Sequence, residues 1–225
     1  MFIGHYAVGF AAKRAAPKTS LGLLIAAPAL ADLLWPVFLL LGWERVRVDP
    51  NPPTPFLALQ LDSFPISHSL LALVGWAALA GGAYWAATRY GPGAVWIAIG
   101  VVSHWVLDFV THRPDMPILP WSETRVGLGL WNSVAATIAV EGAMFAAALW
   151  LYAKTTQPRD RIGRWGFASF VVFVLAVYFA NAFSPTPPPG ARVVAWLTLS
   201  GWLLPFWAAW FDRHREVLPR GPSGR

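Results

Sequence analysis

The sequence has 225 residues, of which 56% are hydrophobic and only 12% are charged. Soluble domains carry about 25% charged residues, so this chain lacks the charge that a water-facing surface needs. The absence of cysteine excludes disulfides, thiolate metal ligands and a cysteine nucleophile. The net charge of +6 is spread in short groups between apolar stretches. We therefore expect the lipid bilayer as partner and no nucleic acid.

The apolar stretches, taken along the chain, predict a membrane bundle. Residues 1–12 fall short of the about 20 residues that cross a bilayer, so they are expected to form a half-helix dipping into it. Six further stretches meet or approach that length: residues 19–42, 67–88, 94–111, 128–152, 163–183 and 193–210. The predicted fold is an all-α polytopic helix bundle with six transmembrane helices plus the short N-terminal half-helix.

We expect a single integral membrane domain over residues 1–225. Within it, residues 1–115 carry most of the intramembrane His and Asp residues, residues 116–212 add three spans, and residues 213–225 form a cytoplasmic tail. Twelve of the 17 Lys and Arg residues fall on one side of the predicted spans. This bias predicts that side, which includes the C-terminus, to be cytoplasmic in the inner (plasma) membrane.

The strongest candidate for a functional site lies in the stretch 94–111. His104, Asp108 and His112 stand four residues apart, so they share one face of a helix. Ionisable groups inside a membrane are costly, and by default they indicate function. A His and a carboxylate at this spacing can hold one metal ion together or form a charge-assisted hydrogen bond.

Other ionisable residues can reach the same depth. His5 lies in the half-helix, His68 begins the second span, and Asp32 lies deep in the first span. Pro36 cannot donate to the carbonyl of Asp32, so we expect the first span to bend there. Glu141, near the centre of the fourth span, is a further candidate acid.

A family resemblance rests on three segments and on the Asp in the first span. The segments are Gly4-His5, Ser67-His68-Ser69-Leu70-Leu71 and Ser103-His104-Trp105-Val106-Leu107-Asp108. Over about residues 1–115 the chain resembles the bacterial inner-membrane proteins described as membrane-bound metal-dependent hydrolases. The resemblance implies a divalent metal ion as cofactor. It also implies a set of metal ligands: His5, Asp32, His68, His104 and Asp108.

Three functions fit these residues. The first is a membrane-embedded metal-dependent hydrolase, whose site opens to the outer face and acts on a lipid-linked or membrane-accessible ester or phosphoester. Its metal could be Zn²⁺, Mn²⁺, Fe²⁺ or Ni²⁺, with Glu141 or Asp32 as general base. The second is a transporter or a proton or cation pathway that uses the intramembrane Asp, His and Glu residues. The third is a non-catalytic membrane scaffold. The oligomeric state stays open.

Overall fold

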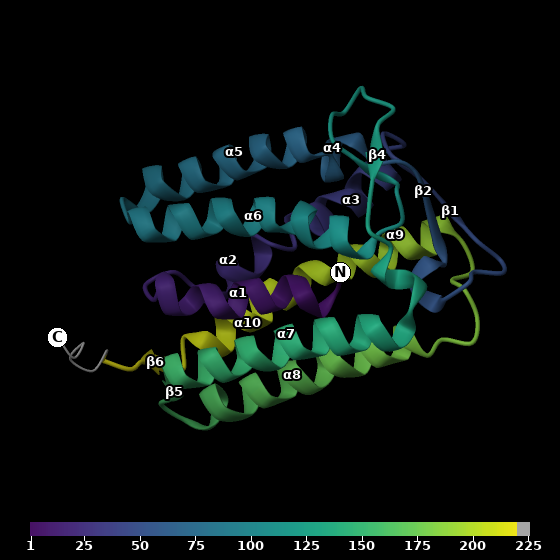
Figure 1. Ribbon diagram of the computed structural model, residues 1–225. Helices are drawn as coiled ribbons and strands as arrows, with labels where there is room; N and C mark the ends of the chain where they lie inside the picture. Colours follow the sequence, from purple (N-terminus) through teal and green to yellow (C-terminus); the bar gives the residue numbers. More distant parts are fainter. Residues whose placement is uncertain (220–225) are drawn as a thin grey trace.

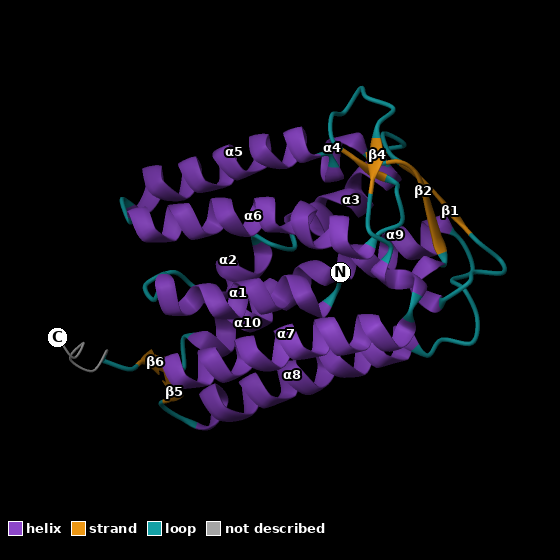
Figure 2. Ribbon diagram, viewed as in Figure 1, coloured by secondary structure: helices purple, strands orange, loops and turns teal. Residues whose placement is uncertain are grey.

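The computed structural model describes residues 1–219 and has the expected helical architecture (Figures 1 and 2). Within residues 1–219, five helical segments are long and apolar enough to cross a membrane. Four are single helices: α5 (Leu70–Thr88), α6 (Gly91–Thr111), α7 (Val134–Thr155) and α8 (Arg161–Ala182). The fifth, residues 191–212, consists of α9 (Ala191–Leu199), the turn η3 (Ser200–Trp202) and α10 (Leu203–Asp212). These five correspond to the last five predicted spans.

The first predicted span, residues 19–42, is not one continuous helix. It is divided into α2 (Leu21–Ala26) and α3 (Leu30–Leu40), with a break at residues 27–29. Pro28 has no N–H to continue the helical ladder, and the main interruption falls there. We expected a bend at Pro36, but that residue lies inside α3. The half-helix expected at residues 1–12 is present as α1 (Ile3–Ala15).

Short strand pairs and turns close the two ends of the bundle. At one end β1 (Arg45–Val48) pairs antiparallel with β2 (Leu59–Ser63), and β3 (Met116–Pro117) with β4 (Arg125–Val126). The same region contains η1 (Pro55–Leu57), α4 (Pro65–His68) and η2 (Leu130–Asn132). These strands lie between the predicted spans, where no strand was predicted.

The opposite end carries β5 (Thr156–Pro158) and β6 (Arg215–Val217), which pair antiparallel. His214, which precedes β6, forms an ion pair with Asp160 at 2.6 Å. Residues 215–217 of the expected cytoplasmic tail are therefore tied to the bundle as a strand. Residues 220–225 of that tail, with Arg220 and Arg225, lie outside the described residues.

Side-chain caps explain where three of the long helices begin. The hydroxyls of Ser69 and Ser133 accept hydrogen bonds from backbone N–H groups in the first turns of α5 and α7. The Asp160 carboxylate does the same for α8. Each cap satisfies one of the backbone donors that a helix start leaves without a partner. A span of otherwise uniform hydrophobicity thus acquires a defined start.

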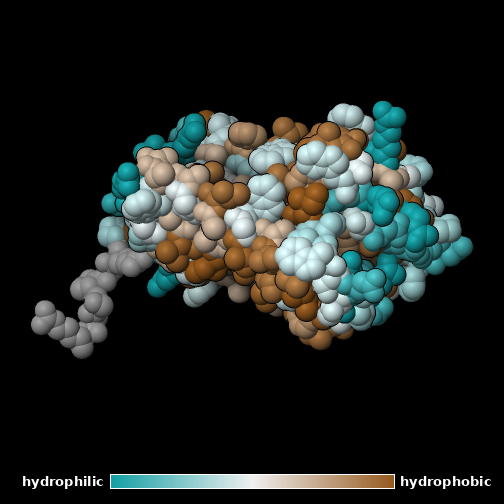
Figure 3. Space-filling model, turned by 90° about the horizontal axis from the view of Figure 1, so that it is seen from above, coloured by the Kyte–Doolittle hydropathy of each residue, from teal (hydrophilic) through white to brown (hydrophobic). Residues whose placement is uncertain are grey.

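The outer surface suits a lipid environment. Figure 3 shows a broad apolar region across the middle of the visible face, with hydrophilic residues gathered towards the two ends. The exposed apolar side chains include one or more from each of the five long segments: Leu79, Val106, Trp150, Val172 and Leu197. An exposed apolar belt of this kind is typical of a protein that spans a lipid bilayer.

The interior is aromatic where α1 meets the later helices. Figure 1 places α1, α2 and α10 between the α5–α6 pair and the α7–α8 pair. Phe10 of α1 is fully buried, and its ring packs edge-on against Phe145 and Phe170. An ideal Cβ built on Gly9 would lie 2.6 Å from the carbonyl oxygen of Leu24. Glycine at this position therefore allows α1 and α2 to approach closely.

A buried ion pair connects the C-terminal end of α1 with the C-terminal end of α10. The Lys13 ammonium donates to Asp212 Oδ2 at 2.6 Å and to the carbonyl of Thr19 at 2.9 Å. Asp212 also accepts from the Tyr152 hydroxyl at 2.9 Å and from the Leu21 amide at 3.0 Å. Lys13 itself is only 5% exposed.

Substituting Asp212→Asn is expected to lower the free energy of unfolding by about 3 kcal/mol, because it leaves the buried Lys13 ammonium without its counter-charge. Denaturant unfolding in detergent measures this. Asp62→Asn is the matched control, because it breaks the exposed Arg47–Asp62 pair and should have a smaller effect. Equal effects of the two substitutions would contradict this role of Lys13.

Candidate functional site

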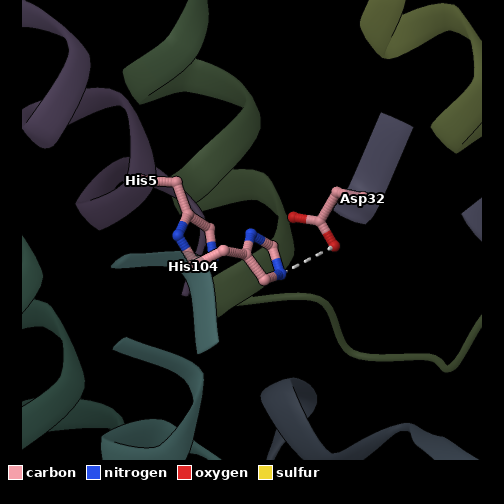
Figure 4. Close-up of side chains that lie close together, drawn as sticks. All are labelled: His5, Asp32 and His104. Carbon is pink, nitrogen blue, oxygen red and sulfur yellow. Dashed lines mark ion pairs between the residues drawn. The ribbon is translucent and has the colours of Figure 1, made fainter. Parts of the chain in front are cut away.

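The five residues singled out as ligands come together from four helices. His5 comes from α1, Asp32 from α3, His68 from α4, and His104 and Asp108 from α6. His104 Nε2 lies 3.0 Å from Asp108 Oδ2 and 3.9 Å from Asp32 Oδ1. His68 Nε2 lies 3.4 Å from Asp32 Oδ1, and His5 Nε2 lies 3.1 Å from Asp108 Oδ1. Figure 4 shows the His5 and His104 rings stacked beside Asp32.

The orientation of His104 is fixed by the break in the first span. Its Nδ1 lies 2.7 Å from the carbonyl oxygen of Pro28. A carbonyl only accepts, so Nδ1 carries the proton and donates it. In neutral imidazole the lone pair is then on Nε2, which faces Asp32 and Asp108. Nε2 has no hydrogen-bond partner within residues 1–219, because the approach of Asp108 lacks hydrogen-bond geometry.

His68 is oriented through a serine and a glutamate. The Ser67 hydroxyl donates to Glu44 Oε2 at 2.6 Å and lies 2.6 Å from His68 Nδ1. Since that hydroxyl has one proton and gives it to Glu44, His68 Nδ1–H is the donor to Ser67 Oγ. His68 Nε2 is thus left to face Asp32. Glu44 also accepts from the amides of Ile66 and Ser67, at 2.8 and 2.9 Å.

His112 repeats the same arrangement at the end of α6. Its Nδ1 lies 2.9 Å from Asp115 Oδ1, and its Nε2 faces Asp108 Oδ2 at 3.6 Å. An ionised carboxylate only accepts, so Nδ1–H donates here too. Three histidines therefore donate Nδ1–H outward and direct Nε2 towards the central carboxylates.

His5 differs from these three. Its Nε2 is hydrogen-bonded to Asp108 Oδ1, and its ring stacks on His104 with centroids 4.0 Å apart. Its Nδ1 is buried and has no hydrogen-bond partner in the described part of the chain. The Met1 ammonium also donates to Asp108 Oδ1. Asp108 is therefore the carboxylate around which the cluster is arranged.

Glu141 reaches the cluster indirectly. Its Oε2 accepts from the backbone amides of Phe2 and Gly4, at 2.9 and 3.1 Å. Phe2 is the N-cap residue of α1 and Gly4 lies in its first turn, where backbone donors lack helical partners. Oε1 is buried and, over residues 1–219, has no hydrogen-bond partner. The contacts of Glu141 thus hold the helix that carries His5.

The burial of the cluster is uneven. His5, His68, His104 and Asp108 are at most 4% exposed, whereas 47% of the Asp32 side chain is exposed. Of these five side chains, that of Asp32 is the most exposed.

In the part of the chain that the structure describes, two overlapping sets of side chains could hold a metal ion. They are His5, Asp32 and His104, and His68, His104 and Asp108, whose ligand atoms lie within 4.8 Å of one another in each set. His104 Nε2 lies near one oxygen of Asp32 and one of Asp108 but is hydrogen-bonded to neither. This arrangement is typical of side chains that bind the same cation. Metal-binding histidines also commonly donate their other N–H to a carbonyl, carboxylate or similar acceptor. The residues fit a divalent ion.

Sequence reasoning missed the groups that orient these histidines. Glu44 lies outside the predicted spans, and it is nevertheless only 1% exposed. The Pro28 carbonyl and Asp115 were not considered. The Ser-His pairing at 67–68 was visible, but only the fold brings residue 44 beside it.

The fold and the cluster define an integral membrane helix bundle with a buried His and Asp centre. The chain belongs to the YdjM inner membrane protein family, whose model matches residues 65–186. The match covers α4 to α8 and includes His68, His104, Asp108 and Glu141. No curated protein and no solved structure matches the chain.

The family match confirms the expected inner-membrane protein and its location in that membrane. It begins at residue 65, so the matched region only partly overlaps the expected resemblance over residues 1–115. The family's description names no reaction and no metal.

Replacing Glu141 with Ala should loosen the start of α1, because the buried amides of Phe2 and Gly4 lose their acceptor. The local cost is about 2 kcal/mol. Hydrogen–deuterium exchange should become faster in residues 2–6, whereas Glu123→Ala, at an exposed position, should leave it unchanged. Unaltered exchange in the Glu141 variant would refute the capping role.

Proposed function

We propose that this protein is a metal-dependent hydrolase embedded in the inner membrane, acting on a lipid-linked ester or phosphoester. One observation carries the proposal: His68, His104 and His112 each direct Nε2 towards Asp32 or Asp108, with Nδ1–H donated outward. Such an array of lone pairs and negative charges favours a cation at its centre. Imidazole and carboxylate ligands without thiolates suit Zn²⁺, Mn²⁺, Fe²⁺ or Ni²⁺.

The alternative of polar residues that only hold helices together explains the geometry less well. Intramembrane hydrogen bonds contribute on the order of 1 kcal/mol each, and burying several ionisable groups costs more than that. Purely structural contacts would also be expected to pair His104 Nε2 with a well-aligned partner. Instead, that nitrogen has none in residues 1–219.

A divalent ion bound here supplies Lewis acidity towards water and towards a carbonyl or phosphoryl oxygen. The chain's own residues position these groups. Asp32 combines a place in the cluster with a half-exposed side chain, so it can accept a proton from the attacking water. Hydrolysis adds that water across the ester bond: its oxygen goes to the acyl carbon or phosphorus, and a proton to the leaving oxygen.

The same contacts argue against a serine nucleophile. In a serine triad the histidine lies between the serine and the acid. Here Ser67 lies between Glu44 and His68, is fully buried, and gives its proton to the glutamate. The apolar belt around the bundle favours a substrate that resides in the membrane.

Elemental analysis of the detergent-purified protein is expected to find about one divalent ion per chain. His104→Ala and Asp108→Asn should each reduce this content at least about tenfold, because each removes a central ligand. His214→Ala is the control and should retain the metal, because His214 pairs with Asp160 at the other end of the bundle. A metal content near zero in the unmodified protein would overturn the proposal.

Turnover is tested separately with a panel of lipid-linked phosphoesters and carboxylic esters in detergent micelles. We expect release of the water-soluble product by the metal-loaded protein and loss of that release with Asp32→Asn, which preserves the shape of the side chain. A metal-loaded protein that cleaves no member of either class would count against the hydrolase.

A further inference from the structure

One buried acid, Glu44, connects the β1–β2 hairpin with the segment that carries His68. Glu44 precedes β1, is 1% exposed, and packs against the chain segment that carries His68. It accepts three hydrogen bonds: from Ile66 N, Ser67 N and Ser67 Oγ, at 2.8, 2.9 and 2.6 Å. The exposed acids of the hairpin have different partners: Asp62 pairs with Arg47, and Asp49 with Gln60.

We propose that Glu44 is a positioning residue that, through Ser67, holds the proton of His68 on Nδ1 and so keeps Nε2 available as a metal ligand. The role of His68 as a metal ligand rests on the proposed function. The hydrogen-bond chain from Glu44 through Ser67 to His68 does not depend on it. Free histidine prefers its proton on Nε2, so the tautomer that these hydrogen bonds indicate requires an acceptor at Nδ1. Ser67 Oγ is that acceptor, and donation of its own proton to Glu44 keeps that proton away from His68 Nδ1.

A change of one atom in Glu44 is predicted to reverse the chain. In Glu44→Gln, the amide oxygen must face the N–H groups of Ile66 and Ser67, because the opposite orientation would set donors against donors. The amide NH₂ then faces Ser67 Oγ and donates to it. The Ser67 proton, which residue 44 no longer accepts, is then available to His68 Nδ1, the other hydrogen-bond partner of this hydroxyl. The His68 proton moves to Nε2, which lies 3.4 Å from Asp32 Oδ1, and the ligand lone pair is lost.

Nitrogen-15 NMR of the imidazole rings tests this proton position without any metal. The chain has five histidines, so single substitutions assign each ring. For the metal-free protein we expect His68 to show a protonated Nδ1 and a bare Nε2. In Glu44→Gln the two shifts should exchange, and in Ser67→Ala the Nδ1-protonated form should diminish. Asp62→Asn is the matched control in the same hairpin and should change neither shift.

The same variants give a second readout, which is metal affinity. Loss of a group that orients a ligand typically weakens binding about 10–100-fold, and we expect this for Glu44→Gln but not for Asp62→Asn. Unchanged His68 shifts in Glu44→Gln, or an Nε2-protonated His68 in the unmodified protein, would overturn the inference. If the shifts exchange as expected but the unmodified protein binds no metal, the hydrogen-bond chain stands and the proposed function fails.

Discussion

The arrangement of the site depends on one electrostatic constraint. Asp108 is 2% exposed inside an apolar bundle, and a buried carboxylate must be matched by positive charge or hydrogen-bond donors. His5, His104 and His112 all approach it, together with the Met1 ammonium. Two of these histidines use their Nδ1 protons elsewhere. The proposed cation, shared between Asp108 and the imidazoles, would supply positive charge to this carboxylate.

The break in the first span links the fold to that centre. In a continuous helix over residues 19–42, the backbone carbonyls would accept hydrogen bonds from amides of the same helix. The interruption at residues 27–29 instead allows the Pro28 carbonyl to accept from His104. Gly100, one turn before His104, lets α6 come close to this break, because an added Cβ would lie 3.0 Å from the Cβ of Ala27. The half-helix α1 then fills the space beside α6 and brings His5 into contact.

The features that depend on short stretches of sequence could be predicted from the sequence alone. Apolar length predicted the last five spans, and the four-residue spacing of His104, Asp108 and His112 predicted a shared helix face. The sequence also identified the polar residues that gather with them, because an ionisable group in an apolar run is conspicuous. The position of the break was missed, because Pro28 and Pro36 both lie in the run and only packing against α6 distinguishes them. The roles of Glu44 and Glu141 were missed for a similar reason: each acts on residues more than twenty positions away in the chain.

X-ray absorption spectroscopy of the purified protein loaded with Zn²⁺ tests the central claim, a cation held by imidazole and carboxylate ligands, most directly. The account predicts a first shell of nitrogen and oxygen atoms at about 2.0–2.2 Å, with the multiple scattering that imidazole rings produce. His104→Ala should reduce the imidazole contribution, and His214→Ala should leave it unchanged. A first shell of oxygen alone, without imidazole scattering, would contradict it.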